Sequence, residues 1–140
     1  MRKVTIIGAG PGNPDLLSRA ALDRVNELAR PQLIVTVDNG IAAKEEVSYL
    51  ESLGIDLVVT DHHEPSDQVP QGMPLTDPKL EDEGPSRELA GAGVALKLVQ
   101  VLGERLGKPS YWRSLIEVAA LGTVSDMMPL TPENRALVAE

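Results

Sequence analysis

Three side chains in this sequence are of the kinds that divalent cations bind in proteins. Asp38 follows a short aliphatic run, His62 follows a second one, and Asp126 lies close to the carboxyl terminus. Carboxylates suit hard ions such as Mg²⁺ and Mn²⁺, and imidazole is also acceptable to Mn²⁺. A pair of such ions can hold a phosphodiester for attack by a bound hydroxide. The residue types therefore suit metal-dependent phosphoryl chemistry, although a lone Asp at a strand end is more often a turn or cap residue.

A strand-helix-strand unit positions the first two of these residues. Residues 33–37 and 57–60 are aliphatic runs that each end in a carboxylate, Asp38 and Asp61. Between them, residues 42–53 carry apolar side chains at helical spacing, and a glycine follows. Such strands run parallel with a right-handed crossover, so their carboxyl ends share the sheet edge where open α/β folds bind ligands. We therefore expect Asp38 and Asp61 at that edge.

His62 and His63 are the two histidines of the chain, and they follow Asp61 directly. If the backbone is extended there, adjacent side chains point to opposite sides. One imidazole could then bind a metal while the other faces a phosphate.

The remaining pattern predicts one α/β domain over residues 1–140, with a small parallel sheet flanked by helices. The amino-terminal half is expected to run β-α-β-α-β, with its first strand at residues 3–7. The second half is expected to be mainly helical, with helices at 90–106, from 110 to 121 and from 131 onward. Residues 61–88, which are acidic and rich in proline, predict an irregular connection with at most a short edge strand at 73–76.

Composition excludes several classes of function. The chain has 140 residues, 42% of them hydrophobic, a formal charge of -8 and no cysteine, so disulfides and thiolate chemistry are excluded. The acidic balance argues against a non-specific nucleic-acid clamp. No apolar run is long enough for a membrane span, so we expect a soluble, cytoplasmic protein. The sequence leaves the oligomeric state open, and a dimer formed through a sheet edge is plausible.

Five sequence motifs follow one another along the chain: TVDNGI at 36–41, VTDHHEP at 59–65, ELAGAGVALKL at 88–98, LGTVSDMMPL at 121–130 and ENRALV at 133–138. In this order they resemble the DHH phosphoesterase superfamily, and specifically its RecJ single-strand exonuclease branch. The resemblance covers about residues 18–140.

The resemblance implies an α/β domain that binds a Mn²⁺ or Mg²⁺ pair and hydrolyses phosphodiesters, with single-stranded DNA as the ancestral substrate. It implies that Asp38 bridges the metals and that His62 and Asp126 are further ligands. His63 is implied to be the substrate-phosphate or acid residue, and Asp61 a support that orients the histidine pair.

The start of the chain departs from that family. The resemblance implies a first strand ending in an acidic DxDxDG-like motif, which this sequence lacks. Residues 4–18, VTIIGAGPGNPDLLS, are instead similar to the opening of tetrapyrrole methylases that use S-adenosylmethionine. That similarity implies a cofactor contact at Gly8, Gly10, Pro11 and Gly12, and it suggests a chimera joined near residue 18.

Three hypotheses follow from these motifs. The first is a chimeric or engineered domain that keeps a partial metal site, binds at best one ion and has no efficient turnover. The second is an active Mn²⁺- or Mg²⁺-dependent single-strand exonuclease. The third is a binder of S-adenosylmethionine or a nucleotide at the glycine-rich turn. The first is preferred, because a catalytic metal pair needs more carboxylates than the sequence places near Asp38. An associated second domain is also expected to be absent, which would leave the substrate groove without its other wall.

Overall fold

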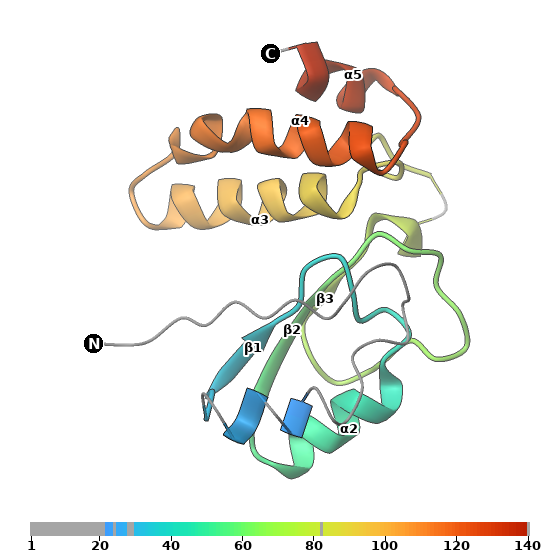
Figure 1. The fold of residues 1–140 in the computed structure, drawn as a ribbon, viewed down its shortest axis with the longest axis vertical. Coiled ribbons are helices and arrows are strands. Elements are labelled where there is room, and N and C mark those ends of the chain that lie inside the picture. Colours follow the sequence, from blue (N-terminus) through green and yellow to red (C-terminus); the bar gives the residue numbers. More distant parts are fainter. Residues whose placement is uncertain (1–21, 24, 28–29, 82, 140) are drawn as a thin grey trace.

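A small parallel sheet forms the lower half of the molecule in Figure 1. The computed structural model describes residues 22–23, 25–27, 30–81 and 83–139. Strands β1 (Leu33–Val35), β2 (Asp56–Thr60) and β3 (Leu75–Thr76) lie in the order β1-β2-β3, and both neighbouring pairs are parallel. The predicted α/β class with a parallel sheet is confirmed. The strand predicted at residues 3–7 lies outside the described residues, and the predicted short edge strand is present as β3.

Helix α2 (Lys44–Ser52) makes the crossover from β1 to β2 and covers one face of the sheet (Figure 1). Its Val47 and Leu50 pack against Leu57 and Val59 of β2, which are also buried. Burying each such side chain contributes about 1.5–3 kcal/mol. Gly54 ends the helix in a left-handed conformation with φ of 68°.

That helix end is a Schellman motif. The amide of Gly54 donates to Glu51 O at 3.0 Å, and the amide of Ile55 donates to Leu50 O at 3.1 Å. The chain therefore turns directly from α2 into β2, and this turn fixes where β2 begins.

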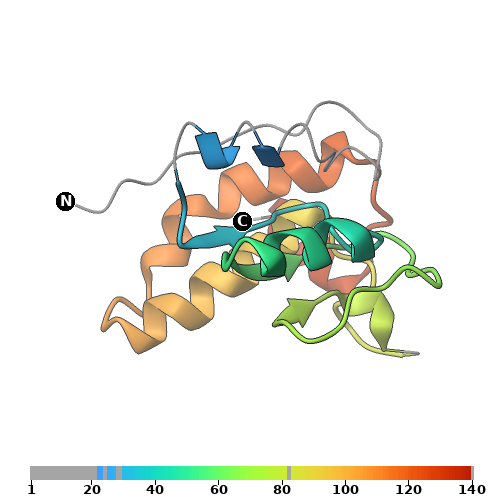
Figure 2. The same ribbon diagram turned by 90° about the horizontal axis from the view of Figure 1, so that it is seen from below.

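A second layer consists of three helices stacked above the sheet in Figure 1. They are α3 (Gly91–Arg105), α4 (Ile116–Ser125) and α5 (Pro132–Ala139), with a 3₁₀ turn η3 (Tyr111–Leu115) before α4. Leu96, Ile116 and Ala119 form a separate buried cluster there. Viewed from below in Figure 2, α3 and α4 lie alongside each other over most of their length. The mainly helical second half was therefore predicted correctly, apart from the 3₁₀ geometry at residues 111–115.

The connection from β2 to α3 has little regular structure, as its proline and acid content predicts. Besides β3 it contains a single 3₁₀ turn, η2 (Pro78–Leu80), among the residues described between 61 and 90. Asp77 caps this turn, since its Oδ1 accepts a hydrogen bond from the Lys79 amide at 2.8 Å.

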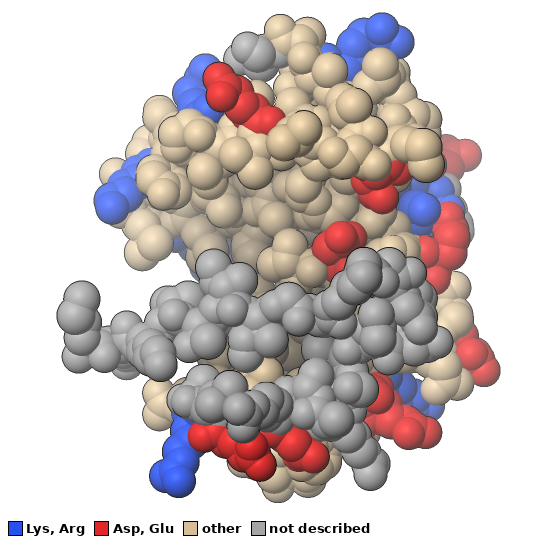
Figure 3. Space-filling model, viewed as in Figure 1, with Lys and Arg blue, Asp and Glu red and all other residues tan. Residues whose placement is uncertain are grey.

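The surface carries a broad apolar area on the helical layer. Figure 3 shows mostly uncharged surface over α3 and α4, with Lys, Arg, Asp and Glu side chains gathered toward the margins. Val118, Leu121 and Val124 of α4 are all exposed. No helix in the described part of the chain combines the length and apolar character that crossing a bilayer requires.

Asn134 of α5 ties the helical layer to the connection that precedes α3. Its side chain is fully buried, and its Nδ2 donates to Glu88 O at 2.5 Å and to Pro129 O at 2.8 Å. Both acceptors belong to irregular segments, so one amide holds together the segment that leads into α3 and the segment that follows α4.

Replacing this side chain tests its role. We expect Asn134→Ala to lower the free energy of unfolding by about 1–3 kcal/mol, because the buried amide is lost and two partly buried carbonyls lose their donor. Chemical denaturation measures this loss. Arg135→Ala, at the exposed neighbouring position, is the control, and equal losses in the two variants would contradict the assignment.

Candidate metal centre

Asp38 lies just beyond β1 in an unusual backbone conformation. Its φ is 63°, in the left-handed region, which Asp tolerates better than most residues. Gly40 follows with φ of 116°, and a Cβ there would lie 3.0 Å from Cγ1 of Val59. The loop therefore folds tightly back over β2 and leaves the Asp38 carboxylate at the carboxyl edge of the sheet.

Asp61 is a fully buried carboxylate directly after β2. Its Oδ2 accepts the Ile41 amide at 2.9 Å, which ties it to the loop after β1. Its Oδ1 accepts the His62 amide at 2.8 Å and His63 Nδ1 at 2.7 Å. Several donors to one carboxylate compensate for its burial, because each hydrogen bond to an ionised group is stronger than a neutral one.

His62 brings the two other acids together. Its Nε2 lies 2.9 Å from Asp38 Oδ1 and 3.4 Å from Asp126 Oδ2. Asp126 directly follows α4, so the helical layer contributes this carboxylate to the edge of the sheet. The hydrogen bond to Asp38 raises the pKa of His62, and the charges of Asp126 and Asp61 reinforce this against the effect of burial. The same hydrogen bond lowers the pKa of Asp38, against partial burial.

His63 is half-exposed and does not point away from His62. The two ring centroids are 4.5 Å apart, so the rings do not face opposite sides as they were expected to if the backbone were extended. The reason is that β2 ends at Thr60 and both histidine amides turn toward the Asp61 carboxylate, so the backbone there is not extended. With Nδ1 held by Asp61, the Nε2 atom of His63 remains for another contact.

Gly91, at the first position of α3, allows the helix to approach Asp38. A Cβ at this position would lie 2.3 Å from Asp38 Oδ1, far inside any contact distance. The neighbour that requires glycine at this position is therefore an acid side chain. Pattern alone gives no signal for this pairing, since the two residues are more than 50 positions apart.

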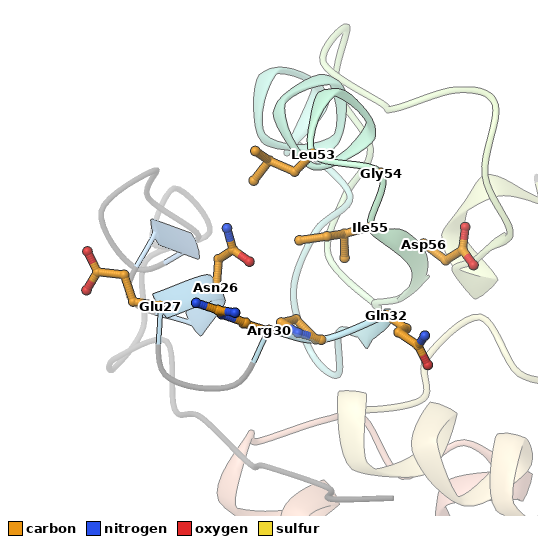
Figure 4. A pocket seen from close by; sticks show the side chains of 9 residues that line it. Asn26, Glu27, Arg30, Gln32, Leu53, Gly54, Ile55 and Asp56 are labelled. Atoms are coloured by element: carbon orange, nitrogen blue, oxygen red, sulfur yellow. The ribbon is translucent and has the colours of Figure 1, made fainter.

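Two hollows flank the sheet. One of about 300 Å³ is lined by Asp38, Gly91 and Asp126 together with neighbours on α3 and α4, and therefore adjoins the acids. A larger one of about 680 Å³ lies at the amino ends of β1 and β2, lined by residues such as Arg30, Gln32 and Asp56 (Figure 4). The larger hollow lies at the other end of the strands from His62. No residue lines both hollows.

The donor set at the carboxyl edge fits a divalent cation. Ligand atoms of Asp38, His62 and His63 lie within 4.8 Å of one another, and Asp126 approaches the same imidazole nitrogen. Carboxylate oxygen with imidazole nitrogen is a set that Mn²⁺ accepts. Among the described residues, His62 Nδ1 is buried without a hydrogen-bond partner, as is Asp77 Oδ2 on the neighbouring strand end.

Comparison with known proteins gives the family. Residues 5–123 match the model of the DHH family, N-terminal domain. The chain belongs to the DHH family. The single-stranded-DNA-specific exonuclease RecJ of Salmonella typhimurium is 44% identical over 117 residues, covering 76% of this chain and 20% of that protein. RecJ of Thermus thermophilus is 40% identical over 123 residues, covering 85% of this chain and 18% of that protein.

Solved structures give the same answer for this DHH chain. A crystal structure of exonuclease RecJ bound to manganese matches with a TM-score of 0.72 and 36% identity, over 86% of this chain and 30% of that one. RecJ from Thermus thermophilus in complex with Mn²⁺ matches with a TM-score of 0.70 and 39% identity, over 84% of this chain and 18% of that one. The chain spans about a fifth of the length of the curated relatives that it matches.

The glycine-rich turn at Gly8, Gly10, Pro11 and Gly12 lies outside the described residues. The family match nevertheless begins at Thr5 and runs through it. None of the matches supports a methylase-like start, and the chimera stays a prediction.

The dependence of stability on pH in the metal-free protein tests the ion pair between His62 and Asp38. Because the pKa of His62 is raised in the folded protein, the ion pair stabilises the fold fully when the pH is below 6.5, the usual histidine pKa. This stabilisation is lost as the pH rises through the raised pKa. We expect the unfolding free energy in EDTA to fall between pH 6 and 9 by about 1 kcal/mol or less, because Asp38 is well exposed. Asp38→Asn should flatten this change, and an unchanged slope would contradict the pairing.

Filling the space at Gly91 tests the approach of α3 to Asp38. We expect Gly91→Ala to weaken Mn²⁺ binding roughly 10- to 100-fold, as changes beside metal ligands do, because the new methyl group displaces the carboxylate. Calorimetric titration measures this affinity. Gly84→Ala is the matched control, since a Cβ there meets nothing closer than 3.6 Å. Equal Mn²⁺ affinities in the two variants would count against the assignment.

Proposed function

We propose that this chain is a metal-dependent phosphodiester-binding domain of the RecJ type, with Asp38, His62 and Asp126 as ligands of one divalent cation, Mn²⁺ or Mg²⁺. The observation that carries the proposal is the convergence of both carboxylates on His62 Nε2, at 2.9 and 3.4 Å. The relatives with solved structures bind Mn²⁺, which supports the same type of ion here.

The cation, when bound, would polarise a phosphate oxygen and lower the pKa of a coordinated water. The residues of the chain have separate tasks around it. Asp38 and Asp126 bring negative charge from two different layers of the fold. His62 must lose its Nε2 proton before it can act as a ligand, since an imidazolium nitrogen has no free electron pair.

His63 is proposed as the residue that meets the substrate phosphate or supplies a proton. Asp61 holds its Nδ1 at 2.7 Å, which fixes the ring and leaves Nε2 facing away from Asp61. Asp61 itself is fully buried and therefore acts as a positioning residue, with no access to substrate.

The number of carboxylates around His62 limits the rate of hydrolysis that we propose. Residues 1–14 contain no acidic side chain. In the described residues, the acids that contact His62 Nε2 are Asp38 and Asp126. Two ions acting as a pair need a richer set of oxygen ligands, so we propose one ion and slow hydrolysis. The alternative is an efficient Mn²⁺- or Mg²⁺-dependent single-strand exonuclease. This alternative is favoured by the relatives, which are single-stranded-DNA-specific exonucleases.

Metal titration and hydrolysis decide between these two functions. We expect calorimetry with Mn²⁺ to give one site per chain, and Asp38→Asn to weaken it at least tenfold, because a charged ligand is lost. Cleavage of a labelled single-stranded oligonucleotide should be slow, Mn²⁺-dependent and abolished by the same substitution.

Asp56→Asn is the matched control, since Asp56 is an exposed acid at the opposite end of β2. Binding of two ions with rapid cleavage would establish the exonuclease alternative. If calorimetry detects no binding of Mn²⁺, both functions are rejected.

A further inference from the structure

A pair of cationic side chains lies beside the candidate metal centre, in a segment that is otherwise acidic. Lys79 and Arg87 are the two basic residues between Asp61 and Glu88. Both interact with Glu64, which directly follows His63: Lys79 Nζ lies 3.1 Å from its Oε1 and Arg87 Nη2 lies 3.9 Å from its Oε2. The cluster therefore begins one residue beyond the DHH motif.

The two cations are held in place more firmly than ordinary surface charges. Only 15% of the Lys79 side chain is exposed, and its backbone belongs to η2, capped by Asp77. Arg87 Nη1 donates to the carbonyl oxygens of Lys79 at 3.1 Å and Glu81 at 2.6 Å. These contacts fix the guanidinium group, so little additional ordering is needed when it binds an anion.

Glu64 contrasts with both of its partners. Its side chain is 70% exposed, and it extends from a loop rather than from a helix or strand. A carboxylate and a phosphate bind Lys and Arg through the same charge-assisted hydrogen bonds. An exposed carboxylate that bridges two fixed cations therefore occupies a position that suits a phosphate group.

We propose that Lys79 and Arg87 form a phosphate subsite for the nucleic-acid backbone, and that Glu64 occupies this subsite until a substrate phosphate displaces it. The ligand is an internucleotide phosphate of single-stranded DNA next to the one at His63. This inference rests on the proposed function, since it names a second contact of the same substrate. It also explains how a chain of charge -8 retains local attraction for a polyanion.

Binding of a fluorescein-labelled oligothymidylate to the whole chain in EDTA, followed by anisotropy, tests this subsite without metal or cleavage. We expect Glu64→Gln to tighten binding about fivefold, because the competing carboxylate loses its charge. Lys79→Gln should weaken binding by a similar factor. It should also reduce the magnitude of the slope of log K against log salt concentration by about 0.7, which is the value for one phosphate contact on a single strand.

Two control variants separate the subsite from net charge. Glu104→Gln and Lys108→Gln change the charge by the same amounts at exposed positions at the far end of α3. The subsite is supported if Glu64→Gln and Lys79→Gln exceed their controls. Equal effects in each matched pair, or no binding by any variant, would overturn it.

Failure of the subsite can be told apart from failure of the proposed function. Normal Mn²⁺ binding together with control-like behaviour of Glu64→Gln and Lys79→Gln would reject the subsite alone. Because Glu64 is exposed, its variant should fold normally, and thermal unfolding of each variant confirms that the comparison is between folded proteins.

Discussion

The buried carboxylate of Asp61 is the group on which the candidate site depends. Its two oxygens join the loop after β1, through the Ile41 amide, to both histidines that follow β2. Removing those hydrogen bonds would leave an unpaired charge in the interior, which is far more costly than the loss of a surface contact. The turn of the chain at His62 and His63, and hence the 4.5 Å approach of their rings, follows from this single requirement.

The second constraint is that the site takes its acids from two layers. Asp38 belongs to the sheet and Asp126 to the end of α4, and they meet at one imidazole nitrogen. This meeting requires α3 to begin against the loop after β1, which Gly91 permits because it has no side chain. It also requires the segments around the helices to stay in place, and the buried amide of Asn134 holds two of them.

Charge is distributed unevenly in a way that suits this chemistry. The acids at the carboxyl edge of the sheet repel a polyanion, and a divalent cation at Asp38 and His62 would offset two of their negative charges. Lys79 and Arg87 supply positive charge next to that place, and Glu64 neutralises part of it in the free protein. Under the proposed function, an acidic domain of the DHH family would in this way meet a phosphodiester at a few points without a basic surface.

The sequence by itself determined the α/β class, the crossover through α2 and the helices of the second half, because local periodicity and turn residues specify these elements. It also placed Asp38 and Asp61 at the same edge, since parallel strands bring their ends together. Tertiary structure alone decided the contact of Gly91 with Asp38 and the tilted approach of the His62 and His63 rings. It likewise decided the bridge from Glu64 to Lys79. The contacts of Gly91 and Glu64 join residues that are separated in the sequence and meet only when the chain is folded, and no local pattern in the chain encodes such pairings.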